Sequence, residues 1–125
     1  MLTTANLRAF VATSDAAKAR EFYEKTLGLI FISDEPYALV FNANGTMLRI
    51  QKVKEVAPIP YTALGWQVDD ISATITELTK NGVVFERFPG IPFDKLGICN
   101  FPNGDKVAWF KDPDGNLLSL DQMAN

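Results

Sequence analysis

Two arginines are the residues of this chain best suited to bind a charged small molecule. Arg8 and Arg49 each fall in a short segment with the apolar–polar alternation of a β-strand. A guanidinium group can hold a carboxylate or phosphate through two parallel hydrogen bonds. If both arginines line a partly dry space, they form a strong anion site that a ligand, or an acidic side chain such as Asp121, must neutralise. The plainer and more common arrangement is that each arginine reaches solvent or pairs with a nearby Asp or Glu.

The chain contains no histidine. Histidine is the commonest transition-metal ligand and the usual general base near neutral pH. Any metal site would therefore use carboxylates, amides or a thiol, which favours hard ions over zinc, iron or nickel. The single cysteine, Cys99, and Ser119 both lack a histidine that could activate them as nucleophiles. We predict no metal site and no cofactor, and we assign no catalytic residue.

The elements that position these residues occur twice. Residues 7–28 have the order strand, Asp, amphipathic helix and Gly, and residues 62–82 repeat that order. Asp15 and Asp70 are the predicted N-caps of the two helices. Glycine-punctuated strands follow each helix. Two copies of one supersecondary unit in 125 residues restrict the fold, and they predict an α+β protein of two tandem βαβββ modules.

We expect one domain covering residues 1–125, with module one at about 5–55, a proline-containing connector at 56–60 and module two at about 61–125. The predicted strands of module one are 7–13, 30–32, 37–41 and 46–53. Those of module two are 62–68, 83–87, 97–101, 105–110 and 116–121, with an irregular insertion at 88–96.

Alternation along the strands predicts which side chains point away from each module's own helix. When the two modules are aligned on their capping aspartates, Arg8 corresponds to Ala63. When they are aligned on the turn glycines, Arg49 corresponds to Ser119. These four positions are therefore equivalent places on the second face of each sheet.

Aromatic side chains on that face would give a ligand flat, apolar walls. Phe10 is the best wall candidate because it shares a face with Arg8. The parity of Trp109 is ambiguous, so core packing competes with ligand stacking for it, whereas Trp66 and Phe22 are assigned to the core. The predicted ligand-binding residues are Arg8, Phe10, Arg49, Gln51, Gln67, Trp109, Ser119 and Asp121.

With "SD…AREFYEKTLGL" early and "FKDPDGNLLSL" late, the chain resembles the vicinal oxygen chelate superfamily. This group includes glyoxalase I, bleomycin-resistance proteins and extradiol dioxygenases. The stretch "DKLGICNFPNGDKVAWFKDPDGN" is similar to a subgroup of unassigned function that is usually labelled only as glyoxalase-like. The resemblance implies a cup-shaped, mostly antiparallel sheet with helices on the outside, built within one chain or across a dimer.

The same resemblance implies where a metal would be held. Metal-dependent members place a His, Gln or Glu near the start of each module's first strand, and a Glu near the middle of each last strand. By motif position those sites are Arg8, Ala63, Arg49 and Ser119 in this chain. None of the four is a usual ligand for the family's metals. The resemblance therefore implies the fold and the cup without the metal chemistry.

Composition narrows the remaining function classes. The net charge is −3 and the basic residues are scattered, so we do not expect a nucleic-acid partner. No apolar run approaches the roughly 20 residues of a membrane span, and the first residues lack a signal-peptide pattern. A single cysteine fits a reducing cytoplasm. We expect a homodimer, from the resemblance and because the sheets leave edge strands to cover.

We predict metal-independent binding of a small anionic or polar-aromatic molecule in the sheet cup, as in sequestration or resistance. The alternative is a glyoxalase-like lyase, isomerase or dioxygenase with a non-standard site, whose acid–base groups would be Asp, Glu or Tyr. A third hypothesis is an interaction module in which side chains fill the second face of each sheet.

Overall fold

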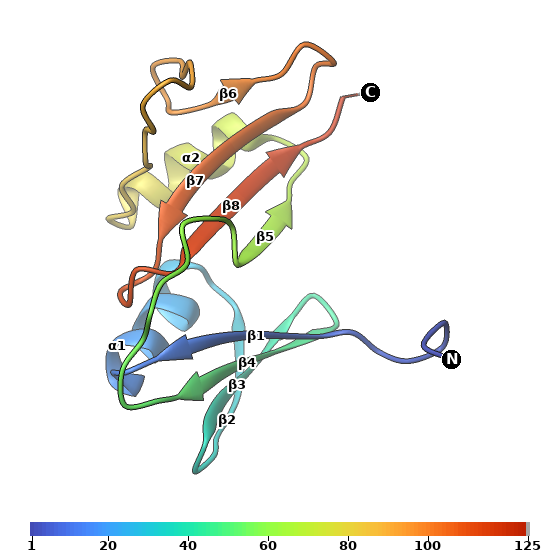
Figure 1. Cartoon of the computed structure of the whole chain (residues 1–125), viewed down its shortest axis with the longest axis vertical. Helices are drawn as coiled ribbons and strands as arrows, with labels where there is room; N and C mark the ends of the chain where they lie inside the picture. Colours follow the sequence, from blue (N-terminus) through green and yellow to red (C-terminus); the bar gives the residue numbers. More distant parts are fainter. Residues whose placement is uncertain (125) are drawn as a thin grey trace. The chain divides into compact units, whose positions relative to one another are not determined.

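The computed structural model describes residues 1–124, and the chain divides into two compact units, Met1–Ala57 and Pro58–Asn125. They are called the first and the second unit below. Each contains a four-stranded mixed sheet and one helical segment (Figure 1). The predicted α+β fold of two βαβββ modules is confirmed.

The first unit has four strands in the order β1-β4-β3-β2. Its elements are β1 (Arg8–Thr13), α1 (Ala16–Glu21), a π-helix η1 (Phe22–Thr26), β2 (Ile30–Asp34), β3 (Ala38–Ala43) and β4 (Thr46–Lys52). The first and last strands, β1 and β4, pair in parallel, and the other neighbours pair antiparallel. This parallel pairing places β1 directly beside the strand that carries Arg49.

The helical segment of the first unit begins and ends where the sequence predicts, but its second half differs. The Asp15 carboxylate accepts a hydrogen bond from the Lys18 backbone N–H at 3.2 Å, as an N-cap does. Gly28, with a φ of +77°, follows the last turn. Between them the chain widens into a π-helix, which apolar spacing does not distinguish from an α-helix. Tyr23 in this turn is fully buried, and its ring centroid lies 6.0 Å from that of Phe41.

Strand alternation gives the first sheet two different faces. The face under the helical segment is apolar and buried; it carries Val11, Leu39, Phe41, Leu48 and Ile50. The opposite face carries no helix of the first unit. Burial of one face fixes the register, because a slip of one residue would expose the whole apolar set.

The second unit repeats this plan with the strand order β5-β8-β7-β6. Its elements are β5 (Leu64–Gln67), α2 (Ile71–Lys80), β6 (Cys99–Asn100), β7 (Lys106–Lys111) and β8 (Leu117–Gln122). The Asp70 carboxylate caps α2 by accepting from the Ala73 backbone N–H at 3.0 Å. Trp66 stacks on Phe110 at 6.4 Å between centroids, on the predicted helix-facing side, but its side chain is only partly buried.

One edge strand of the second unit is interrupted, and two predicted strands are shorter than expected. The strand predicted at 83–87 is reduced to a single bridge between Phe85 and Phe110. The strand predicted at 97–101 is reduced to Cys99–Asn100, which pairs with the other end of β7. The two segments share one edge of β7, and the proline-containing insertion at 88–96 separates them. Among the described residues, no helix is long and apolar enough to span a membrane.

Candidate functional site

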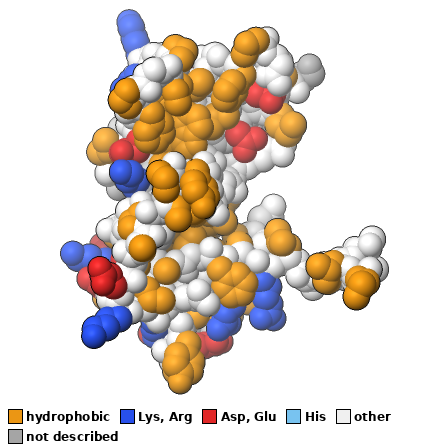
Figure 2. Space-filling model, in the orientation of Figure 1, with side chains coloured by type: hydrophobic (Ala, Val, Ile, Leu, Met, Phe, Trp, Pro, Cys, Tyr) orange, Lys and Arg blue, Asp and Glu red, His pale blue; other side chains and the backbone are white. Residues whose placement is uncertain are grey.

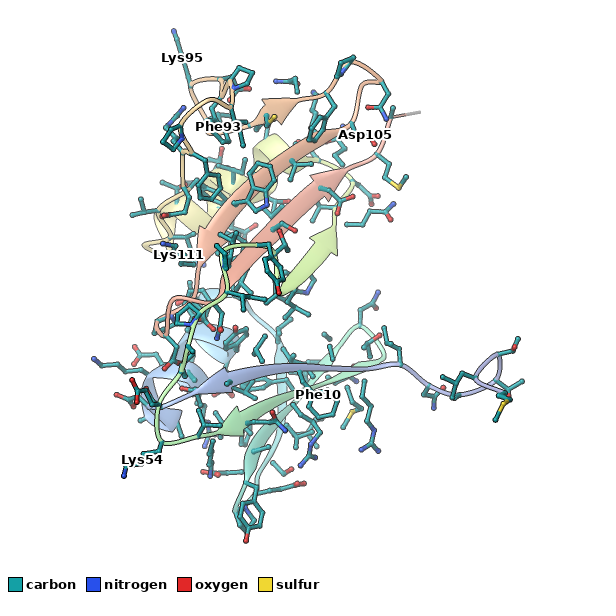
Figure 3. The ribbon with its side chains drawn as sticks, viewed as in Figure 1. Phe10, Lys54, Phe93, Lys95, Asp105 and Lys111 are labelled. Carbon is teal, nitrogen blue, oxygen red and sulfur yellow. The ribbon has the colours of Figure 1, made fainter. Side chains whose placement is uncertain are left out.

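The four predicted site residues of the first unit lie on one face of its sheet. Phe10 is the register partner of Arg49 in the β1–β4 pair, and Ala12 is the partner of Gln51. Arg8 lies two residues before Phe10, so its side chain leaves the same face. The helical segment covers the other face. Strand alternation alone therefore places these four side chains together, and Figure 3 labels Phe10 on β1.

Arg49 has an acidic partner within the first unit. Its Nη1 lies 3.3 Å from Oε1 of Glu35, and the side chains are 26% and 45% exposed, respectively. The Ser33 hydroxyl donates to the other carboxylate oxygen of Glu35 at 3.1 Å. Asp121 was the neutralising residue expected from the sequence, whereas the structure provides Glu35 in this role. The signal available was the Glu35-Pro36 break, because the strand that begins soon after it, β3, lies beside Arg49.

Arg8 differs from Arg49 in its surroundings. Its side chain is exposed, and among the described residues of the first unit it makes no ion pair or side-chain hydrogen bond. Phe10, which neighbours both arginines on this face, is 48% exposed. The face therefore presents an open aromatic ring beside one unpaired guanidinium and one that is held by a half-exposed carboxylate.

The four predicted residues of the second unit also share the sheet face away from their helix. Ser119 pairs with Trp109 on one side and with Gly65 on the other. Asp121 lies two residues further along β8 and pairs with Gln67. This register resolves the parity of Trp109, which lies on the helix-free face.

Trp109 belongs to an aromatic cluster that the insertion completes. Its ring packs edge-to-face against Phe88 and Phe93, with centroids 5.7 and 6.1 Å away. Its indole Nε1–H donates to the Thr62 hydroxyl at 3.0 Å. Phe88, at the start of the predicted insertion, was not among the residues expected at the site. Figure 2 shows hydrophobic side chains gathered over this face of the second unit.

Ser119 is only 9% exposed, so its hydroxyl is poorly accessible to a ligand. A Cβ added at Gly65 would lie 2.5 Å from Oγ of Ser119, so the glycine leaves the space that this hydroxyl occupies. The arrangement gives Ser119 a packing role next to Trp109, while Gln67 and Asp121 remain the more accessible polar groups of the face.

The residues at the four family metal positions do not fit a metal. A guanidinium offers only hydrogen-bond donors, so neither Arg8 nor Arg49 can ligate a cation. Ala63 has no ligating atom, and Ser119 offers a neutral, covered hydroxyl. Within residues 1–124, no three His, Cys, Asp or Glu side chains gather in a way that could hold a metal ion. No reaction step is therefore derived through a metal.

Comparisons with known proteins agree with the fold. Residues 6–120 match the family model described as Glyoxalase/Bleomycin resistance protein/Dioxygenase superfamily. A solved member of this superfamily from Sphaerobacter thermophilus is 25% identical, with a TM-score of 0.76 and coverage of 98% of this chain and 100% of that chain. No curated protein matches the sequence.

Two further structures show the fold in proteins whose activities are named. The lactoylglutathione lyase from Agrobacterium tumefaciens is 19% identical, with a TM-score of 0.73 and coverage of 95% and 93%. The fosfomycin resistance protein FosX from Listeria monocytogenes is 14% identical, with a TM-score of 0.76 and coverage of 97% and 94%. The fold therefore serves both a lyase and a resistance protein. Because the family model spans nearly its whole length, this chain belongs to the glyoxalase/bleomycin resistance protein/dioxygenase superfamily.

Proposed function

We propose that this protein binds a small anionic molecule with an aromatic body, without a metal, and sequesters it. The observation that carries the proposal is the arrangement on the first unit's helix-free face. There an exposed Phe10 lies next to both an unpaired Arg8 and an Arg49 whose partner is a half-exposed carboxylate. The same fold occurs in a fosfomycin resistance protein, FosX from Listeria monocytogenes.

The chemistry of this face favours a headgroup with more than one anionic oxygen. Arg8 and Arg49 are diagonal neighbours on one sheet face, so a phosphate can accept hydrogen bonds from both. The incoming anion replaces Glu35 as the partner of Arg49. The ring of Phe10 supplies an apolar surface beside the headgroup, and the Gln51 amide adds a donor and an acceptor. An aryl phosphate satisfies all of these groups.

The second unit has an aromatic surface of its own. Trp109 provides a large ring held by a hydrogen bond, with Gln67 and Asp121 as nearby polar groups on the same face. Pockets for small molecules combine flat apolar walls with a few placed polar groups. The Asp121 carboxylate disfavours an anion at its end of β8, so we place the proposed anion site on the first unit alone.

The edge strands of the first sheet support the proposed homodimer. In β2, Ile30 and Ile32 are exposed on a strand that pairs on one side only. An apolar edge strand is prone to association unless another chain or element covers it. Multi-angle light scattering tests this state, and a monomer at micromolar concentration would rule it out. Cys99 is buried and forms no disulfide among the described residues, which suits the proposed cytoplasmic location.

Titration calorimetry with phenyl phosphate tests the binding function. We expect Arg8→Gln and Arg49→Gln each to weaken binding by about tenfold or more, since each removes a charge-assisted hydrogen bond. Arg20→Gln is the matched control: Arg20 lies on α1 over the Phe31 ring, on the other face of the same sheet. Equal affinity in all four proteins, or no binding by the wild type, would overturn the proposal.

A further inference from the structure

A pocket opens on the helix-free face of the second unit, where β7 ends and β8 begins. It is lined by Pro58–Pro60, Phe88, Lys111, Gly115 and Leu117, and its volume is about 340 Å³. That volume lies within the range of small-molecule pockets. We propose that this pocket is a second binding site, specific for an aromatic compound with a single carboxylate.

The wall formed by the connector is held at both ends. Pro58 approaches Gly115 so closely that a Cβ on the glycine would lie 3.2 Å from Cγ of the proline. At the other end, Thr62 accepts the indole hydrogen bond of Trp109, and the Ala63 N–H donates to the Leu117 carbonyl at 2.8 Å. Two prolines fix the backbone between these anchors. The wall therefore exists before a ligand arrives, which lowers the entropic cost of binding.

The aromatic wall is also braced. Phe88 packs against Trp109 on the sheet and against Phe93 within the insertion, at 6.3 Å between ring centroids. The insertion is closed by the Arg87 guanidinium, whose Nη2 donates to the Lys95 carbonyl at 3.0 Å. The Asp94 carboxylate accepts from two backbone N–H groups further along the same loop. A flat ring can therefore stack on Phe88 without rebuilding the loop.

Lys111 supplies the only charged side chain of the pocket lining. Its Nζ lies 3.6 Å from Oε1 of Glu86, and its side chain is 51% exposed. A long ion pair that is half open to water is weakly held. A ligand carboxylate can therefore displace Glu86 as the ion-pair partner of Lys111. An ammonium group is a point charge without the fork of a guanidinium, so it suits one carboxylate. Figure 3 labels Lys111 at the end of β7.

This site is independent of the one proposed on the first unit. Every lining residue belongs to the second unit, and neither Arg8 nor Arg49 takes part. The two sites also differ in ligand charge, because one offers two guanidinium groups and the other a single ammonium. Either proposal can fail while the other holds.

Nuclear magnetic resonance of the full-length, nitrogen-15-labelled protein tests the proposal, with naphthoate as the probe. The chain has two tryptophans, so its spectrum contains two indole N–H signals, and Trp109→Phe identifies the one beside the pocket. We expect saturable shifts in the Trp109 indole and in the backbone N–H groups of Gly115 and Leu117. Naphthamide, which has the same rings without the charge, should bind with an affinity at least about tenfold lower.

Substitutions locate the binding. Lys111→Gln should weaken naphthoate binding about tenfold and leave naphthamide unchanged. Lys106→Gln, on the same strand but on the opposite face, is the control. Ile59→Glu places a negative charge at the half-exposed connector wall. This charge repels the naphthoate carboxylate and should also weaken naphthoate binding. The proposal is wrong if Lys111→Gln binds naphthoate as the wild type does, or if the shifts appear around Phe10 instead of Leu117.

Discussion

Neutralising the Glu35 side chain, by Glu35→Gln, should tighten the binding of phenyl phosphate. In the free protein, Glu35 holds Arg49 through an Oε1–Nη1 contact of 3.3 Å. A bound anion must first replace that carboxylate, so the strength of the pair subtracts from the affinity. Glutamine keeps the size of the side chain and removes the charge. The variant therefore presents Arg49 to the ligand without competition.

The structure sets the size of this effect. Two unit charges at this distance in bulk water attract by about 1.3 kcal/mol. Side chains that are 26% and 45% exposed are well solvated. Measured exposed pairs contribute about 0.2–1 kcal/mol, and we take the upper half of that range. A gain of about 0.5–1 kcal/mol corresponds to an affinity about two- to fivefold higher.

Titration calorimetry at low ionic strength measures this gain, and the chain supplies a matched control. Glu24 pairs with Arg20 at the same distance of 3.3 Å and in the same unit, although here the arginine is the more exposed partner, at 45% against 28% for the glutamate. Glu24→Gln changes the net charge equally and should leave the affinity unchanged within error. Weaker binding by Glu35→Gln would refute the reasoning. Equal gains in both variants would show that net charge, rather than release of Arg49, is responsible.

Three further substitutions test the packing that positions the two faces. Phe41→Ala should lower the free energy of unfolding by about 3–5 kcal/mol in urea denaturation, because it empties a fully buried position; a loss below 1 kcal/mol would contradict the packing described. Gly65→Ala should cost about 1–3 kcal/mol through its contact with the Ser119 hydroxyl, and adding Ser119→Ala should recover most of it. Asp112→Ala should cost about 1–3 kcal/mol in the same assay, since the buried carboxylate accepts from the backbone and side chain of Asn116; an unchanged midpoint would exclude this role.

Strand alternation predicted the helix-free faces well. A sheet with one buried face has a strict period of two, so Arg8, Phe10 and Arg49 could be placed on one face before the structure was known. Glu35 could not be placed in this way. It lies in the connection after β2, whose register shifts between Phe31 and Ser33, and no periodicity reaches across that shift.

The insertion and the pocket beside it were beyond prediction for a related reason. Residues 88–96 lack periodicity, so their contacts depend on which strand edge they leave and rejoin. The structure shows that they interrupt the pairing along one edge of β7, which brings Phe88 over Trp109. The proline connector was predicted as a spacer, but its prolines also form a wall. Lys111 lay just beyond the strand predicted at 105–110, and nothing in the sequence indicated a hollow next to it.

A crystal structure of the protein soaked with phenyl phosphate tests the central claim most directly. We expect the phosphate oxygens to lie within hydrogen-bond distance of the guanidinium groups of Arg8 and Arg49, with Glu35 displaced. The phenyl ring should contact Phe10. Two results would contradict the account. One is a phosphate bound elsewhere while both guanidinium groups extend into water, and the other is a metal ion coordinated at the positions of Arg8 and Arg49.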